Sequence, residues 1–286
     1  MPLSAKELVN SVENLVALPS IVVRVNNMTN DKQSSAADIG ETITGNQEIS
    51  TRLLRIANSP FFNFPSHINS VPRAITIIGI PELRDLLLAT CAIDVFDELP
   101  NELISMETFW RHSLRCGLIA RSLASHLHKP NVERFFAAGL LHDIGSLLIN
   151  NRLPELANKV LAQSNNNRQR RFLIEEEVLG FNHATVGGEL LRQWGLPDYI
   201  AEAVEHHHTP GLAKQFPQDA AIAHIANYLS NTMLSKISNN LDASEALDIS
   251  ALKTAGLSPE DLKSILQHSE SLFDDTLEIL VYDQVA

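Results

Sequence analysis

Histidine side chains that could hold a metal ion occur at four places in the sequence. They are His112, His142, His183 and the run 206–208, and Asp143 directly follows His142. Neutral imidazoles and carboxylates are ligands that Zn, Fe, Mn and Ni accept. Because adjacent side chains on a helix diverge by about 100°, an aspartate at a helix end can bridge two metal ions while the histidine before it binds one. The set predicts a metal centre of the kind that activates water and polarises phosphoryl oxygens.

Each histidine alone also has an ordinary structural interpretation. A lone imidazole at the edge of an apolar helix face usually packs or caps, and a histidine at the C-terminus of a helix also suits the helix dipole. It is the set of residues in its order that favours a site. Four further histidines lie on polar or loop segments and are interpreted as solvated: His67, His126, His128 and His268.

Helices must position these residues, because helical periodicity dominates the sequence and strand alternation is nearly absent. An all-α fold is therefore expected. Three helix starts carry a capping serine three residues before a carboxylate, namely Ser4 with Glu7, Ser35 with Asp38, and Ser258 with Asp261. The expected helices are 5–16, 22–28, 36–44, 49–58, 71–78, 81–96, 107–127, 132–142, 153–164, 169–179, 183–193, 198–205, 219–230, 259–267 and 271–281.

A polar break that contains a proline, at 97–101, predicts a boundary between two helical parts. Residues 1–99 are expected to form an N-terminal helical subdomain and 100–235 the helical domain with the His/Asp cluster. Residues 236–286 are expected to form a helical C-terminal appendage. The segment 59–65 is rich in aromatic residues and proline, and its phenylalanines could plug the core or form a partner surface. We favour the core for Phe61, Phe62 and Phe64.

Composition narrows the classes of partner. The 286 residues are 44% hydrophobic and 20% charged, which is normal for a globular protein. The net charge of −12 disfavours direct binding of nucleic acid or anionic lipid, and the short basic cluster of Arg168, Arg170 and Arg171 is interpreted as an exposed helix start. Cys91 and Cys116 lie in apolar helical patterns, as buried thiols of a reducing compartment do. With no signal peptide and no long apolar run, a cytoplasmic protein is expected.

Several segments in order resemble the HDOD family, the output-domain branch of the HD phosphohydrolase superfamily. The resemblance spans roughly 18–230, and its order and spacing are more specific than any single piece. The matching segments are 50–59 (STRLLRIANS), 70–75 (SVPRAI), Gly79, 110–113 (WRHS), 139–145 (GLLHDIG), 183–187, 190–191, 194–197 (WGLP), Val204 and His206-His207. It implies a multi-helix HD-like bundle preceded by an N-terminal helical subdomain, in a bacterial signalling protein.

The resemblance also implies site residues. The metal ligands of the superfamily would fall on His112, His142, Asp143, His183 and one of His206 and His207. The closing aspartate of the HD pattern matches Asn227, whose neutral amide is a weaker ligand, and His224 one turn earlier is an alternative ligand. Cyclic-dinucleotide phosphodiesterases of the superfamily have a lysine where this chain has Ser146, and their Gly-Tyr-Pro signature is missing. Those departures count against hydrolysis of a cyclic dinucleotide.

Two functions remain open. The first, which we favour, is a regulatory module with a degenerate metal site that binds a protein partner, with a nucleotide or phosphoester as a possible second ligand. The second is a metal-dependent phosphohydrolase in which Asp143 and His142 act at a centre of Fe, Mn, Ni, Zn or Mg. An intermediate case is a single metal that His112, His142, Asp143 and His183 hold as a structural clasp.

Overall fold

A computed structural model describes residues 4–12, 15–60, 62, 64, 66–97, 99, 102–165, 167–237, 247 and 249–282. Within these ranges every regular element is a helix and no strand occurs. The expected all-α class is confirmed. None of the helices in these ranges combines the length and apolarity needed to cross a lipid bilayer.

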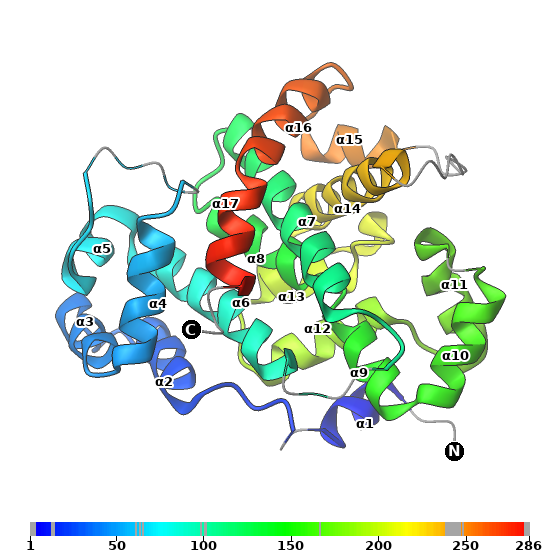
Figure 1. The fold of residues 1–286 in the computed structure, drawn as a ribbon, viewed down its shortest axis with the longest axis horizontal. Coiled ribbons are helices and arrows are strands. Elements are labelled where there is room, and N and C mark those ends of the chain that lie inside the picture. The colour runs from blue at the N-terminus through cyan, green and yellow to red at the C-terminus, as the bar shows by residue number, and fades with distance from the viewer. Residues whose placement is uncertain are drawn as a thin grey trace.

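Four short helices form a lobe at one end of the molecule (Figure 1). They are α2 (Ser20–Asn30), α3 (Ala36–Thr44), α4 (Gln47–Ala57) and α5 (Val71–Ile78). The longer α6 (Ile80–Asp97) runs from this lobe towards the rest of the chain and packs on α2 and α8. The first helix, α1 (Ala5–Asn10), lies away from the lobe and contacts α9 and α12.

Helix α7 (Met106–His126) is central to the remaining helices, since it contacts α8, α14, α16 and α17. Glycines permit the closest of these contacts. A Cβ built on Gly139 of α8 would lie 2.7 Å from the Cα of Gly117 on α7, so α8 approaches α7 with no side chain between the backbones. The elements that follow α7 are α8 (Glu133–Leu141), α9 (Ile144–Arg152), α10 (Pro154–Gln163), α11 (Arg168–Leu179), α12 (His183–Gln193), α13 (Asp198–Glu205), the 3-10 helix η1 (Pro210–Leu212) and α14 (Pro217–Ile237).

A buried polar network joins α6 to α13. The Asp85 side chain, which is fully buried, accepts hydrogen bonds from Arg84 at 2.8 and 2.9 Å. The hydroxyl of Tyr199 on α13 donates to the other carboxylate oxygen at 2.9 Å, and Asn131 before α8 donates to it at 3.1 Å. Because a buried carboxylate is costly unless it is fully paired, this network fixes how α6 lies against α13.

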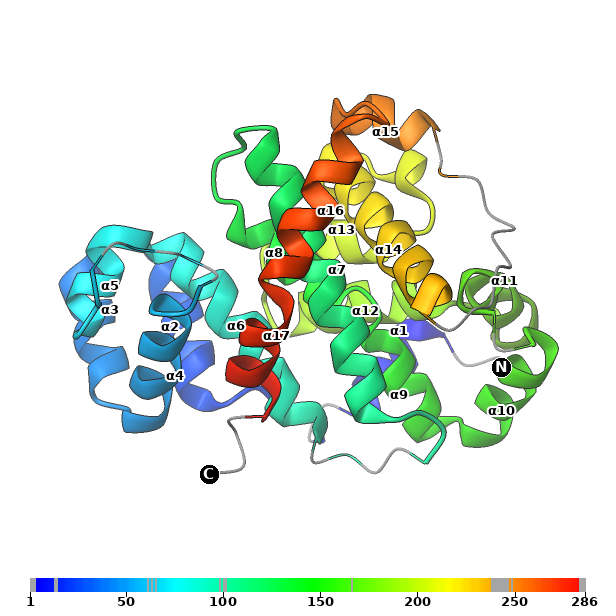
Figure 2. The same ribbon diagram turned by 45° about the horizontal axis from the view of Figure 1, so that its top comes forward.

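The C-terminal elements run from α14 along α7 to α4 of the lobe, and Figure 2 shows them with the top of the molecule turned forward. They are α15 (Ile249–Ala255), α16 (Asp261–Ser271), α17 (Phe273–Leu277) and the π-helical turn η2 (Glu278–Tyr282). Helix α16 packs along α7, where Nε and Nη2 of Arg115 each donate to the Glu270 carboxylate at 3.1 Å, and η2 contacts α4. The buried ring of Phe273 has the guanidinium carbon of Arg115 at 4.0 Å and that of Arg111 at 5.2 Å from its centre.

Most expected helices are present, with ends shifted by a few residues. The capping boxes at Ser4 and Ser35 form, with serine hydroxyls 2.8 and 2.6 Å from the carboxylates of Glu7 and Asp38. The hydroxyl of Ser258 also lies 2.7 Å from the carboxylate of Asp261, but α16 begins only at Asp261, so Ser258 is not the cap of that helix. Helices α9 and α15 were not expected. Phe62 and Phe64 stack 5.4 Å apart and are partly buried against the core, as the core interpretation requires, whereas Phe61 lies outside the described residues.

Replacing Phe273 by alanine tests the attachment of the C-terminal segment. We expect Phe273→Ala to lower the free energy of unfolding by about 3–4 kcal/mol, because a large buried ring leaves a cavity between α7 and α17. Thermal denaturation measures the change. The exposed Leu212→Ala is the control and should stay within about 0.5 kcal/mol of the parent protein. Equal effects of the two variants would contradict the packing described.

Candidate metal centre

Four imidazole rings surround the carboxylate of Asp143. Its Oδ2 atom lies 3.3 Å from Nε2 of His142 and 3.7 Å from Nε2 of His112. Its Oδ1 atom lies 3.2 Å from Nε2 of His183 and 3.7 Å from Nε2 of His207. The rings come from α7, from the junction of α8 and α9, from the first residue of α12 and from the segment after α13. Elements far apart in the sequence therefore bring four Nε2 atoms to one carboxylate.

Backbone carbonyls orient two of the rings. Nδ1 of His142 lies 2.8 Å from the carbonyl oxygen of Gly139, and Nδ1 of His207 lies 2.7 Å from that of Val204. A carbonyl only accepts, so Nδ1 carries the proton in both rings. In the neutral ring Nε2 then presents a lone pair towards Asp143, as a metal-binding imidazole must.

Side chains from two other helices orient the remaining rings. Oε2 of Glu175 on α11 accepts from the backbone N–H of His183 at 2.8 Å and lies 2.6 Å from its Nδ1. The hydroxyl of Ser230 on α14 lies 3.0 Å from Nδ1 of His112. A carboxylate or hydroxyl behind each imidazole is typical of metal ligands, because it fixes the ring and raises its basicity.

The buried Nε2 atoms of His142 and His207 make no hydrogen bond. Buried polar atoms are nearly always satisfied, so these two indicate a partner that is not a protein group. Two sets of ligand atoms lie within 4.8 Å of one another, and both include Asp143. One set is His112, His142 and Asp143, and the other is Asp143, His183, His207 and His208. The donor atoms fit a pair of metal positions that share the aspartate.

The run of histidines at 206–208 divides between the cluster and the surface. His207 is fully buried and faces Asp143, whereas the side chain of His206 is 21% exposed and its Nε2 lies 3.9 Å from Glu205. Of the two alternatives that the sequence left, the geometry thus brings His207 to the cluster. His208, which was not expected there, places its Nε2 3.0 Å from that of His183.

Asn227 lies beside the cluster. It lines a small cavity together with Asp143, and its Oδ1 accepts a hydrogen bond from Asn231 at 2.9 Å. His224, the alternative ligand, instead has its Nδ1 2.8 Å from the backbone oxygen of His207. It supports the backbone that carries His207 and belongs to neither of the two ligand sets.

Burial and charge act in opposite directions on the rings. Burial lowers the pKa of His142, but the carboxylate of Asp143 holds that pKa well above its usual range. Burial also lowers the pKa of His183, but Glu175 and Asp143 raise that pKa to about 9. Burial and then the charge of His142 and His183 keep the pKa of His207 well below its usual range. Two charged imidazoles thus balance two carboxylates, and one divalent cation could replace the two protons without a change in net charge.

The cavity at the cluster is small. Its volume is about 10 Å³, which is space for one water-sized group. Its lining residues are Asp143, Ser146, Arg171, His183, His208, Asn227 and Asn231. Arg171 therefore lines the site, which corrects the interpretation of the basic cluster as wholly exposed, while Arg170 is exposed as expected.

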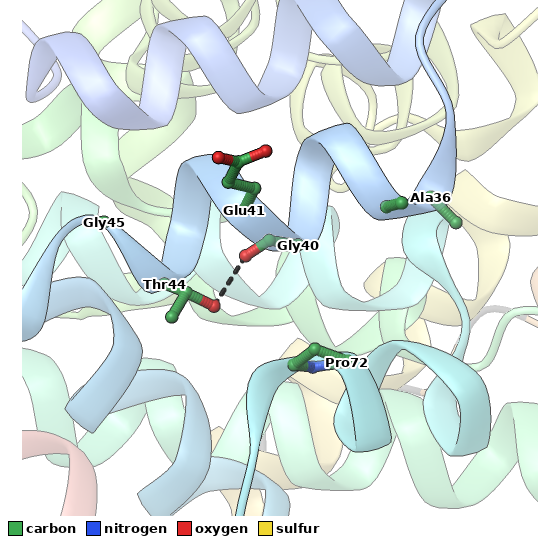
Figure 3. Close-up of a pocket in the computed structure, with 7 residues that line it drawn as sticks. Ala36, Gly40, Glu41, Thr44, Gly45 and Pro72 are labelled. Atoms are coloured by element: carbon green, nitrogen blue, oxygen red, sulfur yellow. Dashed lines mark hydrogen bonds between the residues drawn. The ribbon is translucent and has the colours of Figure 1, made fainter.

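A larger hollow beside α3 offers no comparable chemistry (Figure 3). It has a volume of about 480 Å³ and is lined by small residues, with Glu41 as its one titratable side chain. The hydroxyl of Thr44, which also lines it, already donates to the carbonyl of Gly40 at 2.7 Å. The candidate chemistry is therefore at the His/Asp cluster.

Sequence reasoning missed three residues that complete the cluster. His208 belongs to a run of three histidines, and the direction in which each ring points depends on where α13 ends. Glu175 is one of three consecutive glutamates, and Ser230 is an isolated serine in a helix. None has a motif of its own. Glu175 and His183 lie on separate helices, α11 and α12, so helical spacing does not relate them.

Close contact between α9 and α12 gives a test of the framework. A Cβ at Gly145 would lie 2.1 Å from the carbonyl oxygen of His183 and 2.6 Å from the backbone nitrogen of Gly187. Since both atoms are backbone, we expect Gly145→Ala to push α12 away and to cost about 1–3 kcal/mol or more in unfolding free energy. Thermal denaturation measures this. Gly211→Ala, where the added Cβ meets nothing within 4 Å, is the control. A stable Gly145→Ala would refute the contact.

Glu202 on α13 holds the chain that follows the histidine run. Its carboxylate accepts backbone hydrogen bonds from Lys214 at 2.8 Å, Gln215 at 3.1 Å and Phe216 at 2.5 Å. Although burial raises its pKa, these three N–H groups bring the pKa below the usual glutamate range. The charged form is thus the one that stabilises the fold.

We expect Glu202→Gln to lower the free energy of unfolding by about 1–2 kcal/mol at neutral pH. A carboxyl group whose pKa is lower in the folded state stabilises above its unfolded pKa of about 4.3. This contribution is lost as the pH falls through the folded value. Denaturation curves of both proteins from pH 7 to pH 3 should therefore converge at the acid end. A difference in unfolding free energy that stayed constant from pH 7 to pH 3 would contradict the stabilising role of the charged Glu202 carboxylate.

Comparison with known proteins identifies the family of the chain. A family model described as "HDOD domain" matches residues 15–210. An uncharacterized protein of Treponema pallidum (strain Nichols) is 22% identical over 205 residues, which make up 71% of this chain and 39% of that protein. The chain thus spans about two fifths of the length of this curated relative.

Solved structures share the fold. A protein of Shewanella amazonensis SB2B, provisionally named a phosphohydrolase, has a TM-score of 0.74 at 24% identity over 98% of both chains. An HDOD domain protein with unknown function from Geobacter sulfurreducens has a TM-score of 0.69 at 23% identity, over 96% of this chain and 98% of that one. A protein of Marinobacter aquaeolei VT8, provisionally named a signal transduction protein, has a TM-score of 0.68 at 18% identity, over 94% of this chain and 60% of that one. Since the family model covers well over half of its residues, the chain belongs to the HDOD family.

Proposed function

We propose that this protein is a signal-transduction module of the HDOD type that holds a divalent metal in its His/Asp cluster and acts by binding a regulatory protein. The observation that carries the proposal is the convergence of four Nε2 atoms on Asp143, with every Nδ1 next to a second group. Family membership and the fold of the structure named for signal transduction support the regulatory part.

The metal would be held at one or both of the grouped positions. Asp143 is common to them, and imidazole nitrogens outnumber carboxylate oxygens in each. Such nitrogen-rich donor sets suit Zn, Fe, Ni or Mn better than Mg. When bound, a metal of this kind supplies Lewis acidity and activated water. The protein's own part is to orient the rings through Glu175, Ser230 and two backbone carbonyls.

Three features favour regulation over turnover. The cavity has space for about one water-sized group, far less than a dinucleotide needs. Ser146 at its wall has no charge to offer a transferring phosphoryl group, and charged contacts of that kind are worth about 2–4 kcal/mol in a transition state. Asn227 is neutral where the superfamily pattern has an aspartate. A metal-dependent phosphohydrolase is the second candidate, because the remaining His/Asp ligands of that superfamily are together in one cluster.

Elemental analysis of the purified protein tests the metal part. We expect about one or two equivalents of a transition metal per chain, and loss of that metal in Asp143→Ala. The control is His206→Ala, whose imidazole is next to the cluster in sequence but outside it. Removal of metal by a chelator should also lower the melting temperature, since a ligand bound only to the folded state at 100 times its Kd adds about 2.7 kcal/mol.

Function is tested separately with affinity capture and with phosphomonoester and phosphodiester substrates. The regulatory proposal expects a specific protein partner and no turnover by the loaded protein. Turnover that is lost in Asp143→Ala but kept in His206→Ala would replace it with the phosphohydrolase. A parent protein that folds normally but binds none of Mn, Fe, Ni or Zn would refute the metal site.

A further inference from the structure

Arg171 is a cation without a visible partner at the His/Asp cluster. Its Nε atom is buried and makes no hydrogen bond, and the side chain forms no ion pair with any carboxylate among the described residues. Guanidinium groups that are even partly buried are normally paired, because desolvation without compensation is costly. The side chain is partly exposed and lines the same cavity as Asp143, so it can contact both that cavity and solvent.

The cluster itself fixes where Arg171 lies. Glu175, one turn later on α11, is bonded to both the backbone and the ring of His183. Phe172, the next residue after Arg171, stacks on the ring of His208 with centres 4.3 Å apart and planes 6° from parallel. Two contacts to two histidines thus hold the start of α11 over the cavity. The position of Arg171 follows from them and does not require a partner of its own.

The cavity lining lacks a negative charge for Arg171. Asp143 is the one carboxylate among the lining residues, and the four imidazoles that surround it already share its charge. None of the other lining residues carries a negative charge. The oxygen of Asn227 accepts from Asn231, so the amide NH₂ is what Asn227 can offer to a ligand. A bound divalent cation would balance the charges of Asp143 and Glu175. The positive charge of Arg171 would then have no balancing carboxylate in the cavity lining.

We propose that Arg171, with the amide of Asn227, forms a binding site for a tetrahedral oxyanion of the phosphate type at the mouth of the cavity. The inference deepens the proposed function, since a metal in the cluster would contribute to the same site. One oxygen of the anion fits the space for a single water-sized group, and the rest lies outside by the guanidinium. A planar guanidinium can donate two parallel hydrogen bonds to such an anion. The ligand is therefore a phosphate group, free or at the end of a larger molecule.

Inorganic phosphate is the probe, titrated by calorimetry into the full chain with and without saturating Mn²⁺. We expect Arg171→Gln to weaken phosphate binding about 10- to 100-fold, which is the value of a charged hydrogen-bonding contact. Arg171→Lys should recover part of the affinity, because it restores the charge but not the planar fork. The matched control is Arg170→Gln, which removes an exposed arginine of the same turn and should leave affinity unchanged.

Asn227→Asp provides a test in the opposite direction. A carboxylate at this position would pair with Arg171 and repel the anion, so phosphate affinity should fall at least 10-fold while metal retention stays equal or rises. Melting curves of all variants confirm that they are folded. If Asn227→Asp lowered metal content and phosphate binding together, the loss would belong to the metal and the role of Arg171 would be refuted.

Metal content, measured by elemental analysis in the same samples, separates the inference from the proposed function. Phosphate binding that needs Arg171 in a protein without metal would support this site and refute the metal centre. If instead the protein retained metal and Arg171→Gln bound phosphate as tightly as the parent protein, the metal centre would be supported and the phosphate site refuted. No phosphate binding by the parent protein at millimolar concentration, or equal losses in Arg170→Gln and Arg171→Gln, would overturn the site.

Discussion

A single carboxylate shared by four imidazoles is the constraint around which this structure is organised. Asp143 stands between α8 and α9, and the rings that face it come from α7, α12 and the end of α13 as well as from its own neighbour. Several buried polar groups packed this closely are stable only when further hydrogen-bonding partners fix their positions. Backbone carbonyls, Glu175 and Ser230 do this. Hence the helices, which also share one apolar core, must meet at one point around this carboxylate.

The same requirement explains the helix contacts nearest the cluster. The Gly139 contact brings α8 against α7, and the Gly145 contact brings α9 against α12, in each case closer than a side chain would permit. At these two contacts the helices approach as closely as the polar site requires. Farther from the cluster they pack through their apolar faces. The C-terminal segment extends this arrangement, because Arg111 and Arg115 on either side of His112 hold Phe273 and so tie the site helix to α17.

The class of fold and most of the cluster were predictable from sequence, because they depend on local periodicity and on residue types that seldom occur together. Helix α9 was missed because its apolar residues are continuous with those of α8, and only the turn at His142 and Asp143 separates the two. The choice between His206 and His207 depended on the angle at which α13 ends, which tertiary packing decides. Arg171 was misjudged for a related reason: a basic run looks exposed until the stacking of Phe172 on His208 turns one of its members inward.

The family model ends at residue 210, but the site does not. Helix α14, which begins at Pro217, supplies Ser230 behind His112 and Asn227 at the cavity. A profile drawn over 15–210 therefore includes every grouped histidine but omits Ser230 and Asn227. Two relatives could match it equally well and still differ at these two positions. Extending a comparison through the helix after the family boundary would thus include more of the site than the family match does.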